Sequence, residues 1–129
     1  MKPVLMVVGA REWRHRFADI LSQAGYEVVE ADSGERALEL TPSVLPDVVL
    51  IPIVMPQLNG LETAARLRAL LGSRPLSVIL LGWLPPLGIN EEPLASLVDG
   101  YLNLDAQPNE LLACVSTQVP VSRERQDLT

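Results

Sequence analysis

The sequence predicts a parallel α/β domain in which helices cover both faces of a single β-sheet. The first observation is that short apolar runs rich in Val, Ile and Leu alternate with amphipathic helical segments along the chain. The second is that these runs are apolar at successive positions, which is typical of strands buried on both faces. Because parallel strands require helical crossovers, the alternation favours a doubly wound, three-layer αβα sandwich.

Five segments are predicted to be strands. The third of them is the most apolar, which favours a central position in the sheet. We expect it to end at Ile51, because Pro52 lacks the N–H group that a central strand needs for its ladder of hydrogen bonds. The predicted strands are residues 4–8, 27–31, 47–51, 76–81 and 101–104.

Helical periodicity predicts the segments that connect these strands. The second helix is expected to follow the N-cap Ser33 and to end before Pro42, because proline disfavours helical geometry in the preceding residue. The prolines and glycine of residues 85–93 leave room only for a short or irregular fourth helix that begins near Asn90. The other predicted helices are residues 11–24, residues 61–71 and a last helix from Pro108.

Composition limits the classes of function. The chain has 129 residues, of which 48% are hydrophobic, so we expect one compact domain over residues 1–119 and a polar tail or linker start over 120–129. A net charge of −6 makes direct nucleic-acid binding unexpected. The apolar stretches are too short or too interrupted to cross a membrane. The single Cys114 and the missing secretory pattern favour the cytoplasm.

Four segments carry motifs in a fixed order. They are residues 7–10, 47–52, 55–62 and 100–102. The most specific is the Met-Pro-x-x-x-Gly-x-Glu stretch from Met55, in which Pro56 stiffens the turn and Gly60 permits entry into the next helix. Together these segments resemble the landmarks of receiver domains of bacterial two-component response regulators. The resemblance covers almost the whole chain and implies a flavodoxin-like (CheY-like) sandwich with strand order 2-1-3-4-5.

A receiver of this family accepts a phosphoryl group on an aspartate at the end of its third strand, beside a metal held by two acidic residues. By resemblance, the five positions of this chemistry are now Gly9 and Ala10 (the acidic pair), Pro52 (the phosphoacceptor), Gly82 (the hydroxyl residue) and Leu104 (the lysine). Proline has no side-chain oxygen that could attack phosphorus. Replacing a lysine by leucine removes a cation that would stabilise the transferred phosphoryl group.

No cofactor and no metal are expected. Glu12 is the only carboxylate that the sequence places near the former acidic pair, and a single glutamate would give a weak magnesium site. The sequence also contains no arrangement of residues that suggests hydrolysis. We therefore do not expect an enzyme.

The leading hypothesis is a degenerate receiver, or pseudo-receiver, that regulates through protein contacts without phosphorylation. The resemblance implies that a homodimer or a protein partner would use the face formed by the fourth helix, the fifth strand and the last helix. Several residues of this face are also candidates for the core, and Tyr101 is expected at a strand edge with its hydroxyl in water. The candidate residues are Leu94, Leu97, Val98, Tyr101 and Leu102.

Two alternatives follow from the same residues. The former acidic site becomes an apolar pocket, lined by Pro52, Leu104 and either Met55 or Trp83, which is either inert or the site of a small apolar-ligand sensor. The chain could also be the N-terminal regulatory domain of a longer DNA-binding response regulator. A flavin carrier is disfavoured, because residues 9–12 offer few donors to a phosphate.

A basic group surrounds Trp13 at the start of the first helix. Such a group could contact a phosphate or a nucleic acid, but the acidic domain favours a solvated helix face. His15 has no second histidine or cysteine at ligand spacing, so no zinc site is predicted. The basic residues are Arg11, Arg14, His15 and Arg16.

Overall fold

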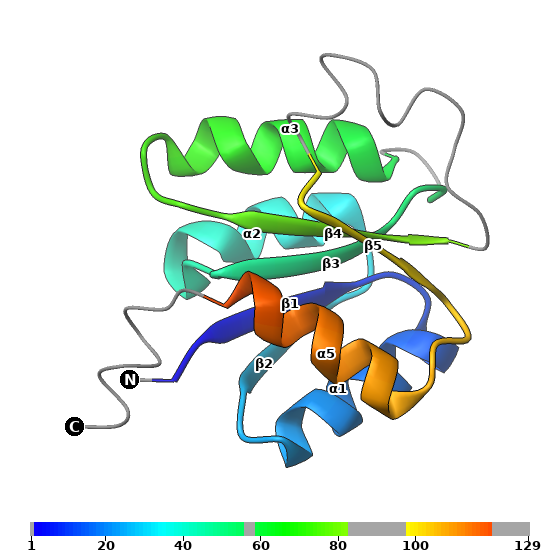
Figure 1. The fold of residues 1–129 in the computed structure, drawn as a ribbon. Coiled ribbons are helices and arrows are strands. Elements are labelled where there is room, and N and C mark those ends of the chain that lie inside the picture. Colours follow the sequence, from blue (N-terminus) through cyan, green and yellow to red (C-terminus); the bar gives the residue numbers. More distant parts are fainter. Residues whose placement is uncertain (1, 56–58, 83–97, 120–129) are drawn as a thin grey trace.

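A computed structural model describes residues 2–55, 59–82 and 98–119 of the chain (Figure 1). The strands form one parallel sheet in the order β2-β1-β3-β4-β5, which confirms the predicted fold class and strand order. The elements are β1 (Val4–Val8), α1 (Arg11–Gln23), β2 (Glu27–Ala31), α2 (Gly34–Val44), β3 (Val48–Pro52), α3 (Gly60–Leu71), β4 (Ser77–Gly82), β5 (Gly100–Asn103) and α5 (Pro108–Gln118).

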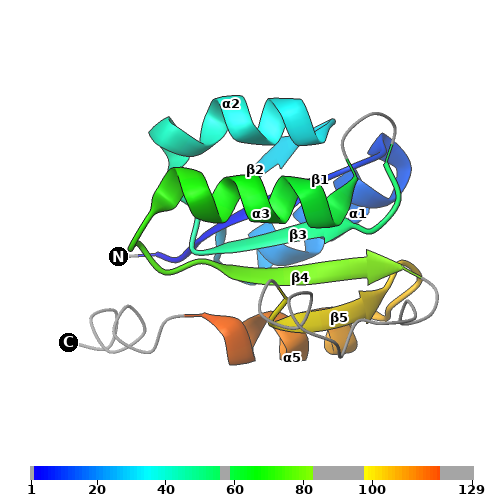
Figure 2. The same cartoon turned by 90° about the horizontal axis from the view of Figure 1, so that it is seen from above.

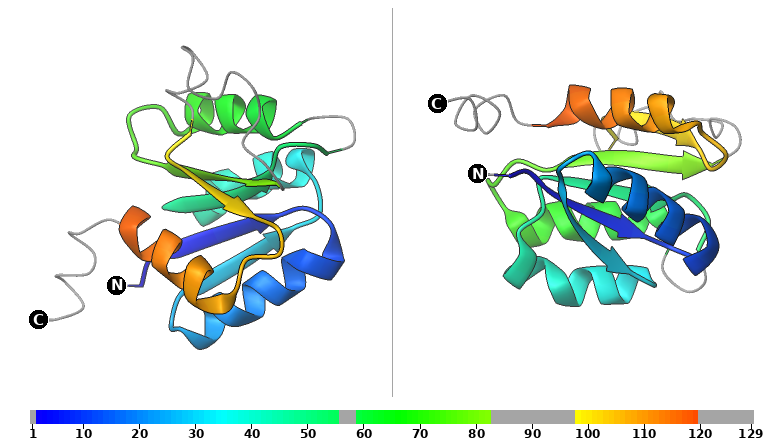
Figure 3. Two further views of the ribbon diagram at one scale, coloured as in Figure 1. Left: turned by 45° about the vertical axis from the view of Figure 1, so that its right-hand side comes forward. Right: turned by 90° about the horizontal axis from the view of Figure 1, so that it is seen from below.

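Helices cover both faces of the sheet, as predicted. Helices α2 and α3 lie side by side on one face, and α1 and α5 lie on the other (Figures 2 and 3). Each face buries its own apolar cluster. Phe17 and Leu111 pack on the α1/α5 side, whereas Ala37 and Leu67 pack on the α2/α3 side. This two-sided burial explains why the central strands lack the alternating pattern of a half-exposed sheet.

Strands β1 and β3 form the centre of the core. Every residue of both strands is buried, and successive side chains point to opposite faces. Leu5 and Leu50 belong to the cluster under α1 and α5, while Met6 and Ile51 belong to the cluster under α2 and α3. The carboxyl ends of both strands therefore lie at the middle of one sheet edge, between the helical layers.

The structure corrects two element ends that were placed at prolines. Helix α2 continues through Pro42 to Val44, because Pro42 lies exposed in its last turn, where the missing N–H costs a single hydrogen bond. The buried Thr41 anchors that turn, since its Oγ1 donates to the Ala37 carbonyl at 2.7 Å and its carbonyl accepts from Leu45 N at 2.8 Å. Strand β3 includes Pro52, whose register partner is Leu81 on β4; pairing with β1 ends earlier, at Leu50.

The bounds of β1 and β2 match the prediction. Other ends differ by one residue: β3 begins at Val48, β4 and β5 are shifted to 77–82 and 100–103, α1 ends at Gln23, and α3 begins at Gly60. Helix α5 begins at Pro108, and the Glu110 carboxylate accepts from Gln107 N at 2.9 Å. The expected fourth helix and the tail from residue 120 lie outside the described residues. Within the described ranges, no helix has the length and apolar character needed to cross a membrane.

Candidate functional site

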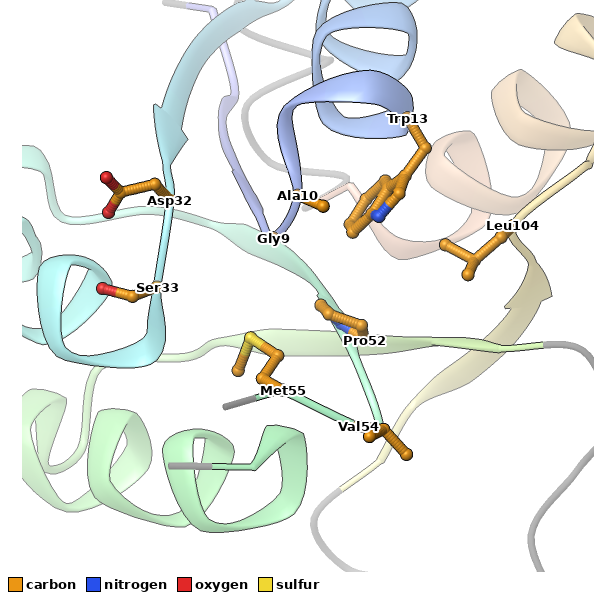
Figure 4. A pocket seen from close by; sticks show the side chains of 9 residues that line it. All are labelled: Gly9, Ala10, Trp13, Asp32, Ser33, Pro52, Val54, Met55 and Leu104. Carbon is orange, nitrogen blue, oxygen red and sulfur yellow. The ribbon is translucent and has the colours of Figure 1, made fainter. Parts of the chain in front are cut away.

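Four of the five changed positions meet around one cavity of about 520 Å³ at the carboxyl edge of the sheet (Figure 4). Gly9 and Ala10 follow β1, Pro52 ends β3, and Leu104 follows β5. Met55 is also present, as expected for this pocket, whereas Trp83 lies outside the described residues. Gly82 is not among the lining residues. The full lining is Gly9, Ala10, Trp13, Asp32, Ser33, Pro52, Val54, Met55 and Leu104.

Trp13 is the largest of four lining residues that the sequence did not predict, the others being Asp32, Ser33 and Val54. It lies in the first turn of α1, half-buried, and its indole ring covers Gly9 so closely that a Cβ on Gly9 would come within 2.1 Å of Cζ2. Gly9 also has φ +135°, a conformation that residues with a side chain rarely adopt. The ring therefore occupies the space into which an acidic side chain at residue 9 would project. No residue pattern in the sequence signals this contact, because it depends on the backbone conformation of Gly9.

Two of the basic residues of α1 bond to loop segments, and the expectation of a solvated face is wrong only for Arg14, because Arg16 is exposed. Arg14, whose side chain is 15% exposed, donates from Nη1 to the Gly9 carbonyl at 2.8 Å and from Nε to Glu30 at 3.0 Å. Arg16 donates from Nη2 to the Ala106 carbonyl at 2.7 Å. His15 is 71% exposed, as expected for a surface histidine.

Asp32 corrects the expectation that Glu12 is the only nearby carboxylate, because Asp32 contributes to the cavity lining. Figure 4 shows, however, that the oxygens of Asp32 and Ser33 point away from Trp13 and Leu104. The Ser33 hydroxyl instead caps α2 by accepting from Arg36 N at 3.1 Å, which confirms its predicted role. Across the described part of the chain, no three His, Cys, Asp or Glu side chains are grouped closely enough to hold a metal ion.

Gly82 contributes to a different feature, the position of Tyr101. A Cβ on Gly82 would lie 2.9 Å from the Tyr101 hydroxyl oxygen and 3.1 Å from Ile53 Cδ1. The tyrosine ring packs against the α2/α3-side cluster, and desolvation by burial raises the pKa of its hydroxyl. Tyr101 is thus partly buried on the edge strand β5, and its hydroxyl lies beside Gly82. The absent side chain at residue 82 leaves the space that the tyrosine uses.

Changing Gly82 to threonine is expected to displace the Tyr101 ring, because the new Cβ would come too close to the hydroxyl. Nuclear Overhauser contacts between the Tyr101 ring and the Ile53 methyl groups measure this displacement, and we expect them to weaken strongly. Gly100→Ala is the control, since its Cβ meets only ordinary contacts of 3.5 Å or more. Unchanged Tyr101–Ile53 contacts in G82T would show that the two side chains do not compete for this space.

The predicted interaction face is described only in part. Leu102 is buried in the α1/α5-side cluster and is unavailable to a partner. Val98 and Tyr101 are partly exposed and pack on the opposite cluster. Leu94 and Leu97 lie outside the described residues. The use of this face by a partner stays a prediction.

The fold and the site at its strand ends define a CheY-like signalling domain, and sequence comparison identifies the family. The family model of the response regulator receiver domain matches residues 4–116. The chain belongs to this family and is a receiver domain of two-component signalling.

Curated relatives agree with this assignment. The chemotaxis protein CheY of Thermotoga maritima is 42% identical over 62 residues, which cover 47% of this chain and 52% of that protein. The nitrate/nitrite response regulator NarL of Escherichia coli is 36% identical over 89 residues, covering 66% of this chain and 38% of that protein. The chain thus spans about half or less of the length of the curated relatives it matches.

Solved structures show the same fold. The chemotaxis protein CheY4 of Vibrio cholerae superposes with a TM-score of 0.84 at 23% identity, over 92% of this chain and 99% of that one. The receiver domain of NarL from Mycobacterium tuberculosis gives a TM-score of 0.73 at 31% identity, over 91% of this chain and 96% of that one.

Proposed function

We propose that this chain is a pseudo-receiver, which regulates its pathway through protein contacts and independently of phosphorylation. The observation that carries the proposal is the packing of the Trp13 indole over Gly9, next to Pro52 and Leu104. An aromatic ring occupies the place where the family's acidic pair would hold a metal. The indole therefore takes the space of an acidic side chain at residue 9, while a cavity of about 520 Å³ without the family's reactive groups remains beside it.

The chemistry of the surrounding residues supports the same conclusion. Pro52 is buried and offers no nucleophilic oxygen. Phosphoryl transfer also needs cations that meet the charge developing on the phosphoryl oxygens. The Arg14 guanidinium lies near the cavity but is already bonded to the Gly9 carbonyl and to Glu30, and Leu104 brings no charge. No catalytic role is proposed for these residues.

The scaffold that carries protein contacts in the family is retained. The sheet, its order and the helical layers are those of a receiver, and Val98 and Tyr101 remain partly exposed near β5. We place the partner, either another protein or a second copy of this chain, on the face that includes β5 and α5, and we place the domain in the cytoplasm. The proposal applies equally to a free domain and to the regulatory part of a longer response regulator.

Incubation with acetyl phosphate and Mg²⁺, followed by intact-mass measurement, is the test. We expect no phosphoryl adduct above the background of a magnesium-free sample, because the domain lacks both the nucleophile and the metal site. A receiver domain that retains its aspartate serves as the positive control under identical conditions. A near-stoichiometric adduct on any residue of this chain would overturn the proposal.

A further inference from the structure

We infer that the cavity at the carboxyl ends of β1, β3 and β5 binds a small, uncharged aromatic molecule. The inference rests on the proposed function in one respect, which is that the cavity no longer serves phosphorylation. The walls come from separate parts of the chain: Trp13 from α1, Met55 from the segment after β3, and Leu104 from the segment after β5 (Figure 4). An occupant would thus contact side chains from three separate segments at once.

The size of the cavity suits a small molecule of more than one ring. Its volume of about 520 Å³ lies within the range of roughly 300–1,000 Å³ that is typical of ligand pockets. For comparison, an engineered apolar cavity of about 150 Å³ is large enough to admit benzene. A fused or linked pair of aromatic rings therefore fits, whereas a single small side chain would leave most of the space unfilled.

The chemistry of the walls favours an aromatic occupant. Trp13 is half-buried, so part of its ring is open to the cavity, and Met55 supplies a polarizable thioether that packs well against aromatic rings. Pro52 and Leu104 add further apolar surface. Val54 is 85% exposed and extends this surface to the rim.

The distribution of charge favours an uncharged occupant. An anion would need a cation in the wall, and none of the described lining residues is a lysine or an arginine. A cation would need a carboxylate directed inward, but the Asp32 oxygens point away from the Trp13 side of the cavity (Figure 4). A charged group that entered would lose its hydration without gaining a partner, which is unfavourable.

A backbone hydrogen bond connects Leu104, and so the cavity wall, to the end of β4. Leu104 N donates to the Gly82 carbonyl at 3.2 Å, and Gly82 in turn leaves the space used by the Tyr101 hydroxyl. An occupant that contacts Leu104 therefore touches the strand ends that position Tyr101. Through this connection, ligand binding would take the place of phosphorylation as the input to the face proposed for partners.

A matched pair of fluorescent probes tests the inference on the full chain. N-phenyl-1-naphthylamine is neutral, and 8-anilino-1-naphthalenesulfonate has the same ring system with an added sulfonate. We expect the neutral probe to bind saturably, one per domain, in the micromolar range and with quenching of tryptophan emission. The sulfonate should bind at least about 10-fold more weakly, because the described lining contains no lysine or arginine to pair with it.

Two variants locate the binding. Leu104→Lys places a charge in the wall, and Ala10→Phe fills the cavity from an exposed backbone position, so each should weaken binding of the neutral probe by about 10-fold or more. Leu70→Lys is the control, because Leu70 is an exposed leucine on α3 outside the cavity. Circular dichroism verifies that each variant is folded.

Three results would overturn the inference: no saturable binding of the neutral probe, binding that survives both cavity variants, or tighter binding of the sulfonate. The acetyl phosphate experiment fails or succeeds independently of these results. A phosphoryl adduct would overturn the proposed function, whereas absence of probe binding without an adduct would overturn only the ligand site.

Discussion

Gly9→Asp is expected to destabilise the domain by about 3 kcal/mol instead of restoring a metal site, because backbone strain and overpacking each cost about 1–3 kcal/mol. The strain arises from φ +135° at residue 9, and the overpacking arises from the 2.1 Å approach of a Cβ to the Trp13 ring. Urea unfolding measures the loss. Addition of Mg²⁺ should leave the unfolding midpoint unchanged, since a bound ion would raise it.

A second background separates the two causes. In a Trp13→Ala chain the ring is absent, so Gly9→Asp should cost less than it does in the wild type, while the contribution of the positive φ persists. This difference is a coupling energy between neighbouring residues. Equal costs in the two backgrounds, or stabilisation of G9D by Mg²⁺, would show that the indole ring does not block the former metal site.

Gly60→Ala is expected to destabilise the domain by about 3 kcal/mol, at the upper end of the usual cost of overpacking. Gly60 opens α3 directly against the end of β3, and a Cβ there would lie 2.1 Å from the Pro52 carbonyl oxygen. That atom belongs to the backbone of a buried strand, so it cannot move aside as a flexible side chain can. Thermal or urea unfolding measures the effect.

The sign of the stability change in Gly60→Ala shows which of two opposing contributions is larger. Helix propensity alone would favour alanine over glycine by up to about 1 kcal/mol, so packing and propensity oppose each other at residue 60. Gly100→Ala is the control, because its nearest contact is the ordinary 3.5 Å distance to Ile79. Equal stability of G60A and G100A would show that α3 does not approach the Pro52 carbonyl this closely.

The fold could be predicted from the sequence because buried strand positions are occupied by apolar residues. Strands β1 and β3 are buried at every position, and a continuous apolar run such as residues 4–8 is typical of a strand that is covered on both faces. The boundaries at Pro42 and Pro52 were wrong for a common reason. A proline removes one N–H group and the hydrogen bond that it would make, and packing around the segment can offset this loss, which neighbouring residues do not reveal.

The site was predicted less completely. Gly9, Ala10, Pro52 and Leu104 were brought to one edge by strand order alone, as the sequence implied. The positions of Trp13 and Arg14 could not be foreseen, because they depend on the backbone conformation of Gly9. Arg14 and Arg16 bond to backbone carbonyls, and a carbonyl acceptor has no signature in the sequence.

The contact between Trp13 and Gly9 also bears on how this domain can change by mutation. The indole ring and a side chain at residue 9 compete for the same volume, so introducing one while the other is present destabilises the domain. A chain that has lost the indole ring and has not yet gained a carboxylate at residue 9 avoids this clash. Substitutions at residues 9 and 13 are therefore coupled, and the order in which they are made decides how stable the intermediate is.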